Sequence, residues 1–256
     1  MPYLTLQRRR IYYDWREGFK PGRDTLIFLH DGLGASGSWK DIPRTLGHML
    51  GANALVYDRW GYGRSEPRGS FPFGFMEGEV PALLELLDGL DLPRVHLVGH
   101  SDGGSIALLF AAQYPERLSS LVTEAAHVFV EPRTRAGIQA LVDAQAAGRT
   151  PSWLKNLHGA RADAVLRAWS KGWLSARHKQ WNIEQGLGAI QLPTLVIQGM
   201  QDEFGSKAQV AAIVDRVAGC RSWLVKSCGH TPHTQAASRF TERVGKFLAR
   251  HINTGP

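Results

Sequence analysis

Cysteine is scarce in this chain, which argues against a disulfide-stabilised fold. Only two cysteines, Cys220 and Cys228, occur among the 256 residues. No residues near them complete a ligand set for zinc. We therefore expect two free structural thiols, no disulfide framework and no metal site.

Long apolar runs are also missing. No run approaches the roughly 20 residues that are needed to cross a bilayer. The first residues, MPYLTLQRRRIYYDW, lack the order of a secretory signal, because their arginines follow the apolar residues instead of preceding them. We expect no membrane partner and a cytoplasmic location.

Acidic residues are outnumbered, since 30 Lys and Arg against 23 Asp and Glu give a formal net charge of +7. Such an excess can indicate a nucleic-acid surface. The basic residues are scattered, however, and residues 7–10 (QRRR) are their only tight cluster. At the start of a predicted strand this cluster is typical of a solvated edge. We expect no nucleic-acid partner, whereas a homodimer stays open.

Short apolar runs alternate with helical patterns along most of the chain. Runs of four to six apolar residues without alternation are typical of strands that are covered on both faces, as in a parallel sheet. The predicted strands are 9–15, 24–30, 52–58, 94–99, 118–126, 193–199 and 222–229, and the predicted helices are 78–92, 103–118, 208–219 and 238–251. This alternation predicts an α/β fold with a doubly wound sheet.

Residues 130–188 interrupt the alternation. They contain no convincing strand, carry helical patterns such as DAVLRAWSKGWL, and hold four of the eight tryptophans. We predict a helical cap at 130–188, inserted into a core made of residues 1–129 and 189–256. The four tryptophans are expected to fill the interior of the cap, and the alternative is that one or two face a substrate pocket. They are Trp153, Trp169, Trp173 and Trp181.

Ser101 lies in a Gly-x-Ser-x-Gly frame that runs from Gly99 to Gly103 within LVGHSDGGSIAL. It directly follows a predicted strand and directly precedes a predicted helix, which is typical of a sharp turn that exposes the hydroxyl. Because glycine has no Cβ, the chain can turn tightly here and the helix can pack close to the strands. We interpret Ser101 as a nucleophile and not merely as a polar residue in a glycine-rich turn.

A serine nucleophile needs a base, and the base needs an orienting carboxylate. His230 follows the last predicted strand and is the predicted base, while His233 is the competitor but lies further from the strand end. Asp202 lies three residues beyond a predicted strand, at the carboxyl edge of the sheet where such a fold gathers its functional loops. It is the predicted acid, with Glu203 and Glu124 as alternatives.

Developing negative charge on the substrate requires two hydrogen-bond donors. One is the backbone N–H of Asp102, directly after the nucleophile at the start of a helix. The other is expected from the glycine-rich loop at 30–39, where Gly32 or Leu33 presents its N–H.

His127 and Phe129, which follow the predicted strand at 118–126, are expected to face the substrate. A structural role for His127 is the alternative. Trp39 and Trp60 are expected to pack within their loops.

Taken together, these motifs resemble the α/β-hydrolase superfamily, in family order across about residues 24–233. They are LHDGLG, YDRWGYGRS (57–65), GHSDGG (99–104), QGMQDEFG (198–205) and CGHTPH (228–233). The resemblance implies a mainly parallel eight-stranded sheet, a helical cap after the sixth strand, and a triad of Ser101, Asp202 and His230 that needs no cofactor.

The chain departs from the family pattern at Asp31, because the common form of this loop has glycine directly after the histidine. A carboxylate that faced the oxyanion would oppose charge development. We therefore expect Asp31 to point away and to accept hydrogen bonds from N–H groups of its loop. The side chain of Asp102 is likewise expected to project away from the substrate.

The predicted function is a serine hydrolase that cleaves a small carboxylic ester through an acyl-enzyme. Haloalkane dehalogenases and epoxide hydrolases of this fold both use aspartate as the nucleophile, so Ser101 argues against these two classes of enzyme. The alternatives are a hydrolase of carbon–carbon bonds in ring-cleavage products and a lactonase. A non-catalytic binding protein of this fold is less favoured, because such proteins often lose a triad member. A small ester or related carbonyl compound is the expected partner.

Overall fold

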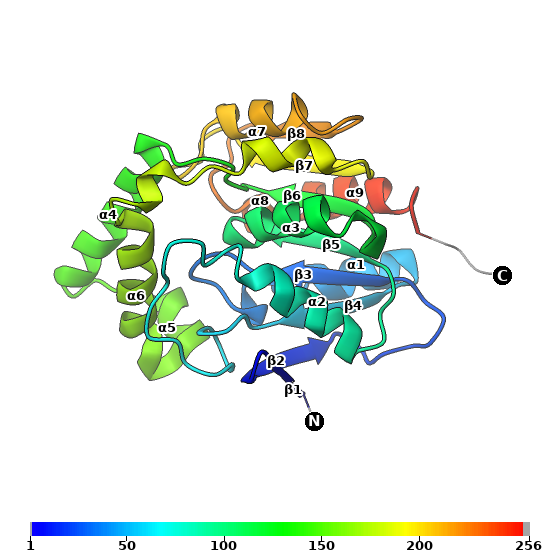
Figure 1. The fold of residues 1–256 in the computed structure, drawn as a ribbon, viewed down its shortest axis with the longest axis horizontal. Helices are drawn as coiled ribbons and strands as arrows, with labels where there is room; N and C mark the ends of the chain where they lie inside the picture. Colours follow the sequence, from blue (N-terminus) through cyan, green and yellow to red (C-terminus); the bar gives the residue numbers. More distant parts are fainter. Residues whose placement is uncertain (1, 253–256) are drawn as a thin grey trace.

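An eight-stranded sheet forms the centre of the molecule in the computed structural model, which describes residues 2–252 (Figure 1). The strand order is β1-β2-β4-β3-β5-β6-β7-β8. β1 and β2 are antiparallel to each other and β2 is antiparallel to β4, whereas the other neighbours run parallel. The strands are β1 (Tyr3–Leu6), β2 (Arg9–Trp15), β3 (Thr25–Leu29), β4 (Asn53–Tyr57), β5 (Val95–His100), β6 (Leu118–Glu124), β7 (Thr194–Gly199) and β8 (Arg221–Val225).

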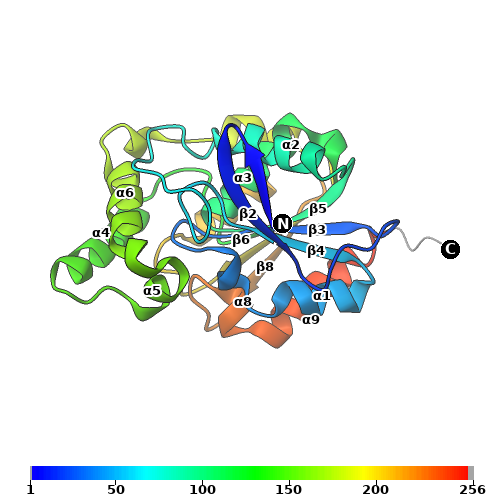
Figure 2. The same cartoon turned by 90° about the horizontal axis from the view of Figure 1, so that it is seen from below.

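Helices cover both faces of this sheet. The α-helices of the described residues are α1 (Ile42–Leu50), α2 (Glu79–Gly89), α3 (Asp102–Gln113), α4 (Pro132–Ala146), α5 (Ser152–His158), α6 (Ala162–Leu174), α7 (Lys207–Val214), α8 (Pro232–Gln235) and α9 (Ala237–Leu248). Figure 2 shows α1, α8 and α9 on one face, and α2 and α3 on the other. The predicted fold class is therefore confirmed.

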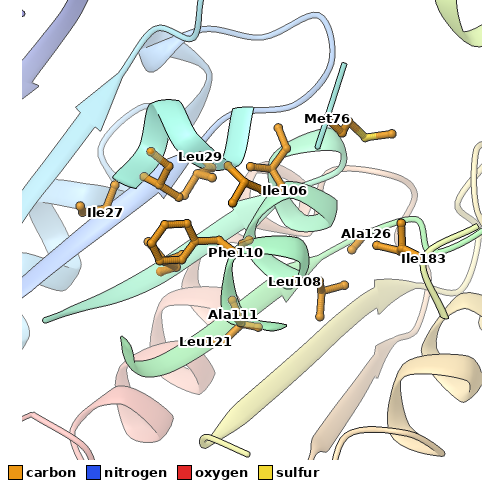
Figure 3. Close-up of a cluster of buried hydrophobic side chains, with 14 of the residues drawn as sticks. Ile27, Leu29, Met76, Ile106, Leu108, Phe110, Ala111, Leu121, Ala126 and Ile183 are labelled. Carbon is orange, nitrogen blue, oxygen red and sulfur yellow. The ribbon is translucent and has the colours of Figure 1, made fainter. Parts of the chain in front are cut away.

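The strands carry apolar side chains on both faces of the sheet, because each face packs against its own core. Along β3, Ile27 and Leu29 pack with Ile106 and Phe110 of α3 (Figure 3). The intervening residues of the same strand, Leu26 and Phe28, face α1 and α9. A strand between two helical layers has no polar side, and this is why its sequence lacks alternation.

The segment between β6 and β7 forms α4, α5 and α6, which lie together at one end of the sheet (Figures 1 and 2). A short turn, η5 (Glu184–Ala189), packs against α3 of the sheet layer. The helices α4–α6 thus stand where the cap is expected, while the division of the chain into two parts at 130 and 188 stays a prediction.

Two other findings bear on the composition of the chain. Cys220 and Cys228 are both free thiols, as expected. Within residues 2–252, no helix combines the length and the apolar character that a membrane span requires.

Candidate active site

Ser101 lies at the junction of β5 and α3 in a strained backbone conformation, with φ 54° and ψ −120°. Its N–H donates to the carbonyl oxygen of Glu124 on β6 (2.8 Å), which ties the turn to the sheet. A Cβ at Gly99 would lie 2.4 Å from the carbonyl oxygen of Gly103, and one at Gly103 would lie 2.3 Å from that of Leu29. Only glycine fits at both positions, so the sequence frame is required by the backbone packing.

Three side chains from the ends of different strands form a hydrogen-bond chain at this turn. Ser101 Oγ is 3.0 Å from His230 Nε2. The other ring nitrogen, His230 Nδ1, is 2.9 Å and 2.8 Å from the two carboxylate oxygens of Asp202. We call this arrangement the Ser101–His230–Asp202 chain. The structure thus brings together the three residues that the sequence predicts as catalytic.

Asp202 is held in place by its own loop. Its Oδ1 accepts the backbone N–H groups of Phe204 (2.7 Å) and Gly205 (3.1 Å), and the amide of Gln198 donates to its Oδ2. Burial alone would raise the pKa of Asp202, but His230 and the N–H of Phe204 hold it below its ordinary value. The carboxylate is therefore charged beside His230.

The competing residues pair with each other behind the serine. His233 Nδ1 is 2.8 Å from Glu124 Oε2, and the backbone N–H of His233 donates to Glu124 Oε1 (2.6 Å). Both side chains are buried, and neither is hydrogen-bonded to Ser101 in the part of the chain that the structure describes. The remaining alternative acid, Glu203, lies at the cavity wall without a bond to His230.

Asp31 faces His100, the residue before the nucleophile, with 3.8 Å between Asp31 Oδ1 and His100 Nδ1. Burial would raise the pKa of Asp31, yet His100 holds it well below its ordinary value. The expectation that Asp31 accepts hydrogen bonds from N–H groups of its loop is therefore wrong. Its side chain packs so closely against Gly34 that a Cβ there would meet Asp31 Oδ1, so only glycine fits at position 34 beside this carboxylate.

The N–H groups of Gly32, Leu33 and Asp102 have no protein acceptor within residues 2–252, and all three residues line the cavity that holds Ser101. Asp102, however, does not project away from this cavity. Its Oδ2 accepts the indole N–H of Trp169 on α6 (2.9 Å), and burial raises the pKa of the carboxyl group. A Cβ at Gly32 would lie 2.4 Å from the same indole nitrogen, so the cap directly covers this loop.

A cavity of about 600 Å³ lies above Ser101, between the loops of the sheet and the helices α4–α6. The cap lines it mainly with apolar side chains. These are Ile138 and Leu141 of α4, Trp153 and Leu157 of α5, and Trp169 and Trp173 of α6. Three of the four cap tryptophans thus reach the cavity, and Trp153, which is 44% exposed, does not fill the interior of the cap.

His127 lines the cavity, and its Nε2 donates to the carbonyl oxygen of Phe204 (3.2 Å). Burial, followed by the neighbouring His230, lowers the pKa of His127 to about 4, so the ring is neutral at pH 7. Phe129 is not part of this cavity. The chain after β6 pairs with residues 182–183, and the antiparallel bridge between Phe129 and Asn182 places Phe129 in a separate depression.

Two cap residues that contact the catalytic loops were not predicted from the sequence. Arg133, at the start of α4, donates to the carbonyl oxygen of Asp202 (2.8 Å). His158, at the end of α5, bonds to Leu33. Neither lies next to a predicted strand, and the sequence carries no signal for such long-range contacts.

Comparison with known proteins identifies the family of this chain. A model of the α/β hydrolase fold family matches residues 24–186. The chain belongs to the α/β-hydrolase family. A curated relative from Paraburkholderia xenovorans, a 2-hydroxy-6-oxononadienedioate/2-hydroxy-6-oxononatrienedioate hydrolase, is 30% identical over 89% of this chain and 88% of its own length.

A second relative of this α/β hydrolase is the mouse serine hydrolase BPHL, which is 28% identical over 76% of this chain and 68% of its own length. The solved enol-lactonase from Burkholderia xenovorans LB400 superimposes with a TM-score of 0.74 at 21% identity, over 96% of this chain and 99% of that one. The names of the curated relatives support hydrolase activity, and the solved structure supports the fold.

Proposed function

We propose that the protein is a serine hydrolase that cleaves an uncharged small carboxylic ester through an acyl-enzyme. The observation that carries this proposal is the Ser101–His230–Asp202 chain at the floor of a closed-over cavity. A hydroxyl group becomes a competent nucleophile when an oriented imidazole can remove its proton.

The tautomer of His230 follows from its partners. The carboxylate of Asp202 can only accept, so Nδ1 carries the proton and Nε2 is left to accept one from Ser101. As Ser101 Oγ bonds to the substrate carbonyl carbon, its proton moves to Nε2, and Asp202 stabilises the imidazolium. His230 then protonates the leaving alcohol. Water repeats the sequence on the acyl-enzyme and releases the acid.

The negative charge that forms on the carbonyl oxygen needs fixed donors. The N–H of Asp102 and the N–H of Leu33 or Gly32 are proposed for this role, because they border the cavity and have no other acceptor among residues 2–252. The N-terminus of α3 adds the positive end of a helix dipole at the same place.

The charges around the cavity favour an uncharged substrate. Lys40 is the one lysine or arginine among the described residues that line it, beside the carboxyl groups of Asp31, Asp102 and Glu203. Two lining histidines, His100 and His233, add positive charge, because burial alone would lower the pKa of both but Glu124 raises it. The dioate in the name of the Paraburkholderia relative carries two negative charges, for which the described lining offers no cluster of lysine or arginine side chains. The apolar cap instead suits an alkyl or aryl group.

A hydrolase of carbon–carbon bonds in ring-cleavage products is the second candidate. It is favoured by the 30% identity to the Paraburkholderia enzyme over 89% of this chain. Both reactions would use the same serine and oxyanion donors, but the leaving group is an alcohol oxygen in an ester and a carbon atom in a ring-cleavage product, which must take up a proton. A substrate panel therefore separates them.

The test is a substrate panel applied to the wild-type protein and to Ser101→Ala. We expect turnover of p-nitrophenyl esters, weaker turnover of lactones, and none of dienone dicarboxylates; Ser101→Ala should lose at least about a thousandfold in kcat. A fluorophosphonate should label the wild-type protein only. Unlabelled wild type would instead indicate a binding protein, and a preference for dienones would replace the esterase proposal by the second candidate.

A further inference from the structure

His158 connects the cap to two loops of the sheet layer. It is the last residue of α5, and only 5% of its surface is exposed. Its Nδ1 is 3.0 Å from the backbone nitrogen of Gly63, and its Nε2 is 2.8 Å from the carbonyl oxygen of Leu33. An amide N–H can only donate, so Nδ1 is the acceptor and Nε2–H donates to Leu33.

The loop that receives this donor is intrinsically permissive. Leu33 stands between Gly32 and Gly34, whose backbones can rotate freely, and the peptide plane after Leu33 has one bond within its loop, from the N–H of Gly34 to the carbonyl oxygen of Asp31 (3.2 Å). The bond from His158 adds a second restraint on this plane, and this one comes from the cap. The N–H of Leu33, one of the two proposed as the second oxyanion donor, belongs to the peptide plane directly before it.

The loop after β4, which contains Gly63, is anchored without His158. Asp58 accepts the N–H of Ser36 (2.6 Å) through one carboxylate oxygen and the N–H of Arg64 (2.7 Å) through the other. Asp58 therefore ties the loops after β3 and β4 together. Arg161 of the cap also donates to the carbonyl oxygen of Gly63, so the bond from Gly63 to His158 is one of several at that place.

We propose that His158 is a positioning residue that holds Leu33 in the orientation needed to bind the oxyanion. His158 belongs to the cap, so the packing of α5 against the loops of the sheet completes the oxyanion site. The inference rests on the proposed serine-hydrolase function and extends it to a residue that touches neither the nucleophile nor its base.

Two substitutions separate the two bonds of the imidazole. His158→Asn places an amide oxygen near the position of Nδ1, which keeps an acceptor for Gly63 but removes the donor to Leu33. His158→Gln places an amide nitrogen near the position of Nε2, which keeps that donor but removes the acceptor. Arg161→Met serves as the matched control, because it removes another cap bond to Gly63 and leaves Leu33 untouched.

With p-nitrophenyl butyrate, His158→Asn should lower kcat about tenfold with KM within about twofold, because loss of a fixed oxyanion donor acts on the transition state. His158→Gln should stay within about threefold of wild-type kcat, and Arg161→Met should match the wild type. The thermal midpoints of the two His158 variants should be similar.

Equal losses of kcat in the Asn and Gln variants, or unfolding of both, would assign His158 a purely structural role and overturn the proposal. An unchanged kcat in His158→Asn would overturn it as well. These results are distinguishable from failure of the proposed function, in which the wild-type protein itself would neither turn over the ester nor react with a fluorophosphonate.

Discussion

At the scale of single residues, Asp202 has two separate groups of partners. Its carboxylate orients His230, and it also accepts the N–H groups of Phe204 and Gly205 that shape the loop after β7. The same charge therefore supports the local backbone and, in the proposed function, the chemistry as well. An asparagine at this position would have nearly the same shape, but one of its two polar atoms would donate a hydrogen bond instead of accepting one.

We predict that Asp202→Asn lowers kcat for ester hydrolysis by about 10⁴, because the amide favours the wrong tautomer of His230. The control is Glu203→Gln, which removes the neighbouring carboxylate and should change kcat by less than about threefold. Steady-state kinetics with a p-nitrophenyl ester would measure both. A larger loss in the Glu203 variant would mean that the acid has been assigned to the wrong residue.

At the scale of elements, the turn between β5 and α3 depends on backbone-to-backbone contact. The atoms that a new Cβ would meet at Gly103 belong to the carbonyl groups of Leu29 and His30, at the end of β3 and directly after it. A backbone in the middle of a parallel sheet cannot move aside as a flexible side chain does.

Gly103→Ala should therefore destabilise the protein by about 2 kcal/mol or more and lower kcat, although alanine normally favours a helix over glycine. Gly69→Ala is the matched control, because a Cβ at Gly69 would meet no atom within 4 Å. Urea unfolding and ester kinetics on both variants would check this. A stable and active Gly103→Ala would show that α3 can shift away from β3.

At the scale of the whole molecule, the change of folding stability with pH depends on buried histidines that must stay neutral. His178 lies between the rings of Phe75 and Trp181, with Trp173 at its edge, and neither of its nitrogens has a polar partner within residues 2–252. Burial, reinforced by the charge of Arg135, lowers the pKa of His178 to about 4.

Because the folded-state pKa lies below the ordinary value of 6.5, the unfolded chain binds a proton that the folded chain does not between pH 6.5 and 4. Stability should fall as the pH drops through this window. His178→Phe should lose less stability than the wild type between pH 7 and 4, by about 2–3 kcal/mol. Urea midpoints at both pH values would test this, and identical losses would contradict it.

The elements missed by the sequence interpretation are those whose stability comes from packing. β1 (Tyr3–Leu6) is a four-residue edge strand that is only partly buried. α1 contains Pro43 and Gly47, which weaken any helical pattern, yet Ile42 and Leu46 are buried where α1 packs against α9. The predicted helix at 208–219 is also shorter, because α7 ends at Val214.

The sequence by itself determined the sheet, the turn at Ser101 and the order of Ser101, Asp202 and His230, because each of these depends on residues next to a strand end. Only the tertiary structure decided which groups face the cavity. Phe129 lies outside the cavity because its backbone pairs with Asn182. The side chain of Asp102 faces the cap because Trp169 donates a hydrogen bond to it. Such contacts join residues tens of positions apart, and a local pattern contains no record of them.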